Sequence, residues 1–380
     1  MQKPFLRRFT KKLLIIINVC IGVLFLCGAH AARFDPVSWW FFNLVSLTLP
    51  YLLAALLIFI FFWLVAKPWL ALIPVVFIAL AWQPVQHVIP PRLSSNFEMQ
   101  KKAGDLRVMS WNVELFNILS HKKNPEKRQA MFDLINRYNP DIACFQEVVA
   151  GDDKEAVNYF PDIFNALKFK DYLYSYQLRF DFDKHHHFGI LVLSKFPLVR
   201  KQTMVNNPDD YNSTFQFVDV AIQEDTIRVF NIHLQSLKFS RENMEYLSGE
   251  RTAKSENIAE SKNIISKIRT GIIKRASQAT FIKDEMNHSP YPLIVCGDFN
   301  DVPASFAYET IGKGLQNAFV QKGAGLSHTF AGISPTLRID NIFAAPAFSI
   351  EQYTRVNKVI SDHFPIIADI KLKKGELNSF

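Results

Sequence analysis

Acidic, amide and histidine side chains stand at the ends of several short apolar runs in this sequence. The residues that follow these runs are Asn112 and Glu114 after LRVMSW, Glu147 after DIACFQ, His233 after TIRVFNI, Asp298 and Asn300 after PLIVCG, Asp340 after LRI, and Asp362 and His363 before FPIIADI. Side chains at the ends of buried strands can converge at one edge of a rigid core. The set is rich in oxygen atoms and contains two histidines, so the first hypothesis is a polar reaction site.

Each of these residues also has a purely structural explanation. Asp298 lies within Gly-Asp-Phe-Asn-Asp, and Gly-Asp and Asn-Asp pairs are typical of turns. Asn112 could cap a loop, and His363 could be a hydrogen-bonded histidine of the core. For any single residue the structural explanation is at least as good as the functional one, but it does not require the whole set.

The elements that must position these residues are a mixture of strands and helices. Runs of four to eight residues rich in Val, Ile and Phe predict strands. Apolar residues at helical spacing predict helices over 125–138 and near 253–286. The mixture indicates an α/β or α+β domain built on sheets, and the stretch 105–374 has the size of one large domain.

The first hundred residues have a different composition, which indicates a membrane region. Three uncharged stretches lie between Lys12 and Arg33, between Asp35 and Lys67, and between Lys67 and Arg92. Each reaches the ~20 residues that a helix needs to cross the hydrocarbon core. We therefore expect a transmembrane region over 1–92 with spans near 13–32, 44–66 and 69–88, followed by a polar linker over 93–104. Pro74 and Pro84 predict that the third span is kinked or partly re-entrant.

Charge gives an orientation and little information about a substrate. Residues 1–100 hold 8 of the 43 basic residues and 2 of the 35 acidic ones, so most of the net charge of +8 belongs to the membrane region. The basic residues before the first span place the N-terminus in the cytoplasm by the positive-inside rule (Arg7, Arg8, Lys11 and Lys12). Three crossings then leave the following domain outside the cytoplasm. An alternative is a signal peptide cleaved at Ala29-His30-Ala31, which leaves two crossings and the domain on the same side.

Six short motifs in the order of a known family then give the polar residues a context. The motifs are Ser110-Trp111-Asn112-Val113-Glu114, Phe145-Gln146-Glu147, Asn231-Ile232-His233-Leu234, Gly297-Asp298-Phe299-Asn300, Arg338-Ile339-Asp340 and Ser361-Asp362-His363. Together they resemble the endonuclease/exonuclease/phosphatase superfamily, on its DNase I and sphingomyelinase side. The resemblance implies a two-layer β-sandwich flanked by helices, and hydrolysis of phosphate esters with Mg²⁺ or Mn²⁺.

The resemblance also implies roles for single residues. The metal ligands would be Glu147 with Asn112, Glu114 and Asp362, all of which offer the oxygen atoms that Mg²⁺ prefers. Glu114 stands where many members of the superfamily have Asp. The catalytic residues would be Asp298 as general base, Asn300 beside it, His233 and His363 facing the phosphate, and Asp340 orienting His363.

The sequence leaves the substrate open between nucleic acid and phospholipid. The segment Ile339-Asp340-Asn341 lacks the Cys-Asp-Arg pattern usual in inositol polyphosphate 5-phosphatases, so that branch fits poorly. The domain after residue 100 is almost neutral, which does not favour long nucleic acid. No protein partner can be inferred; the lipid bilayer is the expected surrounding of the spans. The alternative to an enzyme is a catalytically silent membrane receptor or scaffold with the same fold.

Two further segments have no assigned role. The basic, helix-forming stretch 237–288 could form a lid or contact lipid headgroups, although a solvated helix face is the better explanation. The triplet His185-His186-His187 looks like a metal-binding box, but we interpret it as loop residues near the site because a zinc centre needs spaced ligands.

Overall fold

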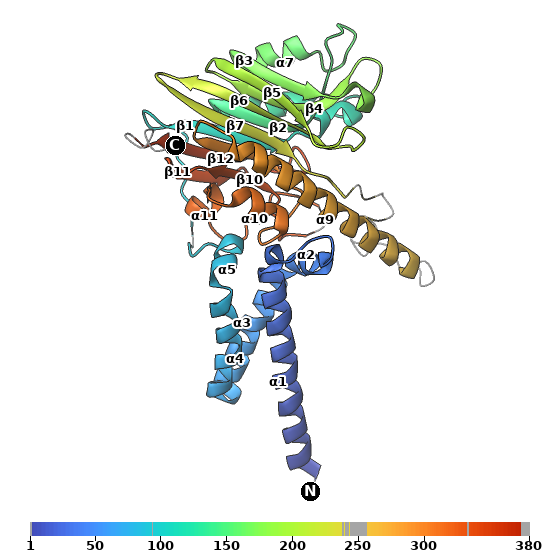
Figure 1. The fold of residues 1–380 in the computed structure, drawn as a ribbon, viewed down its shortest axis with the longest axis vertical. Coiled ribbons are helices and arrows are strands. Elements are labelled where there is room, and N and C mark those ends of the chain that lie inside the picture. Colours follow the sequence, from blue (N-terminus) through green and yellow to red (C-terminus); the bar gives the residue numbers. More distant parts are fainter. Residues whose placement is uncertain are drawn as a thin grey trace.

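The computed structural model describes residues 2–92, 94–237, 239, 243, 257–332 and 334–373. A bundle of helices from the first ninety residues extends downward in Figure 1, and a β-sandwich lies above it. The upper ends of the helices contact the sandwich. The chain therefore has a helical region and a sheet-based domain, each of a different composition.

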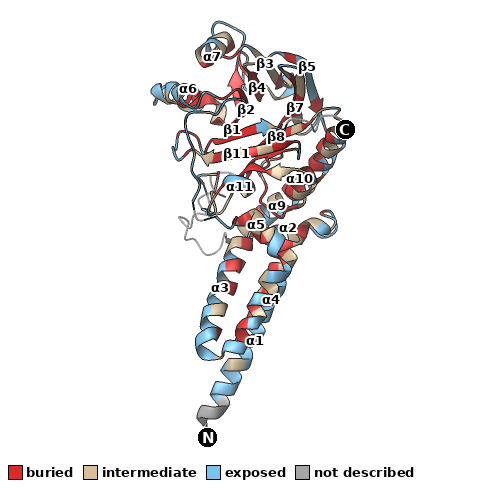
Figure 2. Cartoon of the chain, turned by 90° about the vertical axis from the view of Figure 1, so that its left-hand side faces the viewer, coloured by how far each residue is buried: buried red, intermediate tan, exposed pale blue. Residues whose placement is uncertain are grey.

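The helical region consists of long apolar helices joined by short turns. Its elements are α1 (Gln2–Ala29), η1 (Ala31–Arg33), α2 (Trp40–Ser46), α3 (Leu49–Ala66), η2 (Pro68–Ala71), α4 (Leu72–Leu80) and α5 (Trp82–Val88). The stretch Leu6–Ala29 and helix α3 are each long and apolar enough to cross a membrane, and Pro68–Leu80 with Trp82–Val88 forms a bent pair with an angle of 74°. Figure 2 shows that much of the surface of these helices is exposed, as expected for helices that face lipid.

The bend between α4 and α5 has an identifiable cause. Proline has no N–H to bond the carbonyl four residues earlier, and its ring clashes with that carbonyl, which for Pro84 belongs to Leu80. The helix breaks at Ala81, directly after Leu80. The Nε2 atom of His30 lies 3.4 Å from the Leu80 carbonyl oxygen and replaces part of the lost bonding. The kink in this segment follows the proline, as the sequence predicts.

The sheet-based domain contains two six-stranded mixed sheets. The first sheet has the strand order β11-β12-β1-β2-β4-β3, and the second has the order β5-β6-β7-β8-β10-β9. The strands are β1 (Leu106–Asn112), β2 (Ile142–Ala150), β3 (Asp171–Tyr176), β4 (His187–Ser194), β5 (Leu198–Val205), β6 (Thr214–Ile222), β7 (Asp225–His233), β8 (Leu293–Asp298), β9 (Gln316–Asn317), β10 (Asp340–Ala344), β11 (Phe348–Arg355) and β12 (Ile366–Leu372). The predicted two-layer sandwich is therefore confirmed.

The two sheets pack face to face, and helices cover both outer faces (Figure 1). Side chains such as Val108, Ile142, Val229 and Ile294 fill the space between the sheets. Among the described residues, the helices of the domain are α6 (Glu126–Tyr138), α7 (Phe160–Leu167), α9 (Asn257–Asn287), α10 (Phe306–Gly312) and α11 (Ala318–Lys322), with 3-10 turns at Glu114–Ser120 and Leu178–Phe180. Helices α6 and α7 pack on the first sheet, and α9 and α10 pack on the second. The helices predicted over 125–138 and near 253–286 correspond to α6 and α9, although 253–256 lie outside the described residues.

A parallel pair of strands lies inside each sheet, and this pair determines where side chains can gather. Strands β1 and β2 are parallel and joined through α6, and β7 and β8 are parallel and joined through α9. The remaining pairings are antiparallel. The carboxyl ends of both parallel pairs meet at one edge of the sandwich. Polar residues at those ends are therefore brought together from distant parts of the sequence.

Candidate active site

The predicted polar residues lie at this common edge of the two sheets. Asn112 ends β1, His233 ends β7, and Asp298 ends β8. Asp340 begins β10 and pairs directly with Asp298 in the antiparallel register. His363 lies just before β12. The sequence pattern of polar strand ends thus corresponds to a single place in the fold.

Asp298 lies at the centre of the cluster and is almost completely buried. Its Oδ2 atom is 3.6 Å from Nε2 of His233 and 3.6 Å from Nε2 of His363. The amide of Asn112 donates a hydrogen bond to the same oxygen at 3.2 Å. The backbone N–H of Asn300 donates to the other oxygen at 2.8 Å. One carboxylate therefore accepts hydrogen bonds from the end of β1 and from the loop after β8, and it faces two imidazoles.

Asp340 and His363 form a tight pair beside Asp298. Nδ1 of His363 lies 2.9 Å from Oδ2 of Asp340, which fixes the ring and turns Nε2 towards Asp298. The hydroxyl of Thr329 accepts the backbone N–H of Asp340, and Trp111 donates its indole N–H to the His363 carbonyl. A carboxylate that orients a histidine through Nδ1 is the arrangement needed to hold the opposite nitrogen ready for a substrate.

Burial and neighbouring charges shift the pKa values of these groups in different directions. Burial lowers the pKa of His233 to about 4, so this imidazole is neutral at pH 7. Burial raises the pKa of Asp298 to about 6, helped by the charge of Asp340 and opposed by the two histidines. Burial alone would lower the pKa of His363, but the carboxylates of Asp340 and Asp298 outweigh it and raise the pKa well above its usual value. The cluster thus combines a neutral and a charged histidine around one basic carboxylate.

Glu147 lies on the more open side of the cluster. Its backbone has a φ of +52° at an irregularity in the pairing of β2 with β4, which lets the side chain leave the pleat of the sheet. Its carboxylate is 3.6 Å from Nε2 of His233, and 29% of the side chain is exposed. Burial and the charge of Asp362 raise the pKa of Glu147, while His363 and a hydrogen bond with Asn112 lower it. Glu147, Asn112 and Asp362 are therefore electrostatic neighbours at the rim.

Two of the predicted residues have partners that the sequence did not indicate. The carboxylate of Glu114 pairs with Nζ of Lys127 at 2.9 Å, and 41% of this side chain is exposed. The amide of Asn300 donates to the carbonyl of Leu234, so its backbone rather than its side-chain N–H contacts Asp298. Asn300 lies in the cluster. The carboxylate of Glu114 is held towards α6, although its charge still contributes to the raised pKa of Glu147.

Further residues complete the site although no motif marked them as functional. The amide of Asn212 lies 3.4 Å from Nε2 of His233, and a hollow lined by Phe180, Phe188 and Tyr211 opens beside these two residues. The loop around Asn212 consists mostly of turn-forming residues in the sequence, which gave no indication of this role. The hollow offers apolar and aromatic surface next to the polar cluster.

The two sheets are joined directly below the site by a buried amide pair. The side-chain N–H of Gln146 in β2 donates to the side-chain oxygen of Asn231 in β7 at 2.7 Å. Asn231 in turn donates to the carbonyls of Phe145 and Leu191, both at 3.1 Å. These contacts explain why both motifs contain an amide: they hold the half of the site on β2 in register with the half on β7.

The basic segment 237–288 and the histidine triplet both form specific ion pairs in the structure. Arg275 of α9 is buried and its Nε lies 3.0 Å from the carboxylate of Asp301, so the solvated-face interpretation is wrong for this residue. Most of the segment before Asn257 lies outside the described residues. Each histidine of the triplet has its own carboxylate: Asp153 for His185, Asp183 for His186 and Asp181 for His187.

Comparison with protein families assigns both parts of the chain. A model described as the Endonuclease/Exonuclease/phosphatase family matches residues 109–363, which include all nine predicted site residues. A second model, described as a domain of unknown function (DUF8431), matches residues 11–88 of the helical region. No curated protein of similar sequence is found.

Solved structures show the same fold at low sequence identity. An endonuclease/exonuclease/phosphatase from Bacteroides vulgatus is 20% identical with a TM-score of 0.52, and the match covers 71% of this chain and 99% of that one. A family protein from Bacteroides thetaiotaomicron is 18% identical with a TM-score of 0.52 over 72% and 99%. The human Nocturnin catalytic domain with bound sulfate is 18% identical with a TM-score of 0.51 over 75% and 100%. These likenesses confirm the DNase I-like sandwich.

Proposed function

The chain belongs to the endonuclease/exonuclease/phosphatase family, and from that premise we propose that it is a membrane-anchored phosphoesterase dependent on a divalent metal ion. The observation that carries this proposal is the placement of Asp298 between two histidines, one of them paired with Asp340. A silent receptor or scaffold has no need for a buried carboxylate with two imidazoles at 3.6 Å, because such groups are expensive to bury.

The residues at the rim fit Mg²⁺ or Mn²⁺. Glu147, Asp362 and Asn112 offer carboxylate and amide oxygens. Burial and the repulsion by Asp362 both raise the pKa of Glu147, and a bound cation would oppose both effects. The ligand atoms of Asp298, Asp340 and His363 also lie within 4.8 Å of one another. We favour the rim because His363 is already committed to Asp340 and carries its own positive charge. When bound, the metal would neutralise charge on a phosphate oxygen.

The side chains around Asp298 account for the proton and charge movements of hydrolysis. Asp298 accepts a proton from water, since a pKa near 6 makes it more basic than an ordinary carboxylate while leaving it mostly ionised at pH 7. The water oxygen forms a bond to phosphorus as the bond to the leaving oxygen breaks, and the leaving oxygen takes up a proton from the solvent. The charged imidazole of His363 and the amide of Asn212 lie where they can donate hydrogen bonds to the phosphate.

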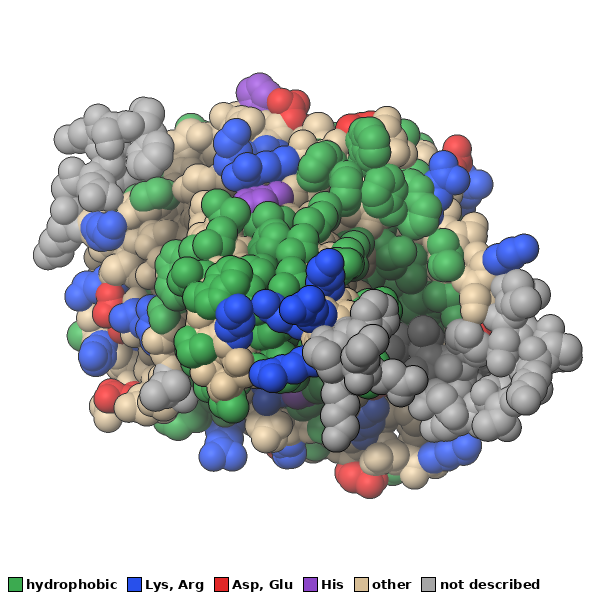
Figure 3. All heavy atoms as spheres, turned by 90° about the horizontal axis from the view of Figure 1, so that it is seen from below, with side chains coloured by type: hydrophobic (Ala, Val, Ile, Leu, Met, Phe, Trp, Pro, Cys, Tyr) green, Lys and Arg blue, Asp and Glu red, His purple; other side chains and the backbone are tan. Residues whose placement is uncertain are grey.

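The charge distribution of the helices supports a membrane position with the sandwich outside the cytoplasm. Lys67, in the turn between α3 and η2, is close enough to Lys11 to interact with it electrostatically. The basic residues Arg7, Arg8, Lys11, Lys12 and Lys67 therefore share one end of the bundle, and the sandwich lies at the other. In Figure 3, hydrophobic side chains gather over the helices and Lys and Arg side chains lie beside them. By the positive-inside rule the basic end is cytoplasmic.

The test uses the full chain in detergent or lipid with bis(4-nitrophenyl) phosphate, an activated diester that needs no specific recognition. We expect hydrolysis with Mg²⁺ or Mn²⁺, none with EDTA, and loss of hydrolysis in Asp298→Asn. Folded protein that hydrolyses neither this diester nor phospholipid or nucleic acid would instead support the silent receptor.

A further inference from the structure

Helix α10 and the loop before Asp340 form hydrogen bonds and an ion pair with the helical region. The backbone N–H of Phe306 donates to the side-chain oxygen of Asn43 in α2 at 2.8 Å, and Nδ1 of His87 in α5 lies 2.9 Å from the carboxylate of Glu309. The guanidinium of Arg338 donates to the backbone carbonyl of His87. These contacts start from buried or half-buried groups, so they fix the orientation of the sandwich on the bundle.

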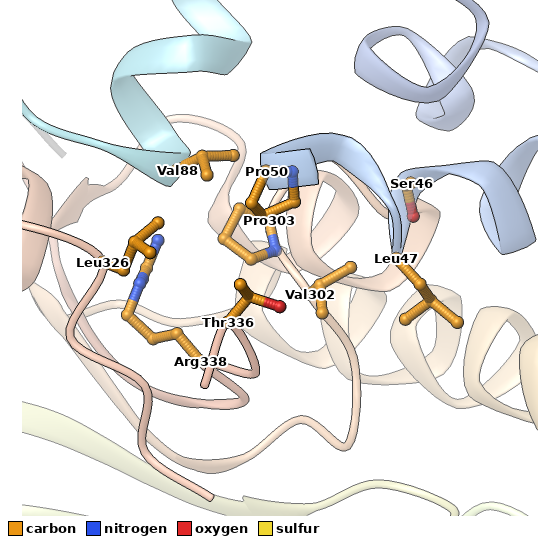
Figure 4. A pocket seen from close by; sticks show the side chains of 9 residues that line it. All are labelled: Ser46, Leu47, Pro50, Val88, Val302, Pro303, Leu326, Thr336 and Arg338. Atoms are coloured by element: carbon orange, nitrogen blue, oxygen red, sulfur yellow. The ribbon is translucent and has the colours of Figure 1, made fainter. Parts of the chain in front are cut away.

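Apolar packing reinforces this junction. Ala304 belongs to one buried cluster with Phe25, Leu53 and Val85 of the helices. The pocket in Figure 4 lies between the two parts, with Pro50 and Val88 on the helical side and with Val302, Pro303 and Arg338 on the other. The domain therefore packs directly against the helices and is not connected to them by the linker alone.

The chain length from these contacts to the site limits the height of Asp298 above the helices. Ala304 follows Asp298 by six residues, and a fully extended chain covers at most ~3.3–3.6 Å per residue. Asp298 therefore lies within about 20 Å of a residue that is packed against the bundle. Arg338, which contacts α5, precedes Asp340 by only two residues.

The upper ends of the helices have the features of a membrane surface. The stretch Leu6–Ala29 covers ~36 Å and α3 covers ~27 Å at 1.5 Å per residue, close to the ~30 Å of a hydrocarbon core. Just after α1, the rings of Phe34, Trp39, Phe41 and Phe42 contact one another, and Trp39 and Phe41 are 49% and 38% exposed. Exposed aromatic rings at this position are typical of the headgroup level.

Helix α9 connects this level with the site. Its Arg269 lies over the ring of Trp40 in α2, at 5.9 Å from the ring centroid. Six residues later, about 9 Å along the helix, Arg275 pairs with Asp301 beside the site. Gln278, in the next turn, donates to the carbonyl of Asn212. Helix α9 thus contacts both the aromatic residues after α1 and the residues beside the site.

From this arrangement we propose that the substrate is a phospholipid of the membrane that holds the chain, with its headgroup phosphate entering the site from the bilayer surface. The inference rests on the proposed function. Asp298 is held within about 20 Å of the residues that pack against the helices, which suits a phosphate that stays in the headgroup layer. A freely diffusing nucleic acid gains nothing from this fixed position. Water adds to phosphorus, one phosphorus–oxygen bond breaks, and the released alcohol oxygen takes up a proton.

The experiment offers the full chain, reconstituted in vesicles of equal parts phosphatidylcholine, phosphatidylethanolamine and phosphatidylglycerol, three substrates in parallel. They are the vesicle lipids, single- and double-stranded oligonucleotides, and bis(4-nitrophenyl) phosphate. We expect metal-dependent release of phosphorylated product from lipid at a kcat/KM at least tenfold above that for oligonucleotides. Hydrolysis of the soluble diester and of oligonucleotides without lipid turnover would overturn the lipid proposal and leave the phosphoesterase intact. No hydrolysis of any substrate would overturn both.

An interface variant tests the geometric reason for the preference. Asn43→Ala removes the acceptor for Phe306 and loosens the seating, so lipid turnover should fall several-fold while turnover of the soluble diester stays unchanged. Ser38→Ala, in an exposed hydrogen bond to Asp35 of the same segment, is the matched control and should change neither. Glu309→Gln offers a second loosened interface if Asn43→Ala does not fold. Equal losses on both substrates would show that the junction supports only the fold.

Discussion

The two parallel strand pairs contribute different halves of one site. The pair β1 and β2 brings Asn112, which is buried, and Glu147, which keeps 29% of its side chain exposed and makes this half the more open one. The pair β7 and β8 brings His233 and Asp298, whose side chains are only 2% and 1% exposed. The open half suits a metal that exchanges with solvent, and the closed half suits groups whose pKa values are shifted by burial. The same strand–helix–strand plan thus serves two kinds of chemistry through a difference in burial.

The helical region contacts the two halves unequally. Its described polar contacts reach Phe306, Glu309, Val320, Ser334 and Arg338, all in the half built on the second sheet. The helical region therefore bears directly on the half that carries Asp298 and Asp340. The half that carries Glu147 is positioned through the sandwich, by way of the amide bridge between Gln146 and Asn231.

The largest effect should come from the closed half, in Asp298→Asn. The variant keeps the shape of the side chain but removes the base, so kcat on bis(4-nitrophenyl) phosphate should fall by ~10²–10⁴. Asp225→Asn, at the far end of β7, is the control and should retain full activity. Retention of activity in Asp298→Asn with an unchanged metal dependence would remove Asp298 from the base position.

Next in size should be the loss of the bridge that joins the halves, in Asn231→Ala. Asn231 is buried and its amide serves three partners, so their loss should lower the free energy of unfolding by about 3 kcal/mol. Thermal unfolding in detergent measures the change. Asn165→Ala, an exposed amide on α7, should stay within about 0.5 kcal/mol. Equal stability of the two variants would mean that packing alone keeps the sheets in register.

The positions of the polar residues were accessible from the sequence because strand ends are marked by abrupt changes from apolar to polar residues. That pattern, with the motif order, was enough to predict the sandwich and the set around Asp298 and His363. It could not predict the partners of Glu114 and Arg275, since a long charged side chain has many reachable partners and only the packed fold selects one. Nor could it reveal Asn212, because the sequence of a turn-rich loop has the same composition whether or not the loop faces a site.

A smaller effect is expected in the open half, in Glu147→Gln. Replacing one carboxylate at the rim should raise the Mn²⁺ concentration for half-maximal activity by ~10–100-fold, since Glu147 interacts with both Asn112 and Asp362. A titration of activity against Mn²⁺ measures the shift. If kcat falls while the Mn²⁺ dependence stays the same, the metal lies instead with Asp298, Asp340 and His363.

The smallest effect should come from Glu114→Gln. This variant tests whether Glu114 binds the metal or is merely close to Asn112 in the sequence. Glu114 follows Asn112 by two residues, but its carboxylate pairs with Lys127 and is half exposed, and exposed ion pairs contribute only ~0–1 kcal/mol. The Mn²⁺ titration of this variant should therefore shift less than fivefold, and Lys127→Met should behave in the same way. A shift as large as that of Glu147→Gln would mean that Glu114 leaves Lys127 when the metal binds. The open half would then rearrange on binding, because the carboxylate of Glu114 would exchange its ion pair with Lys127 for the metal.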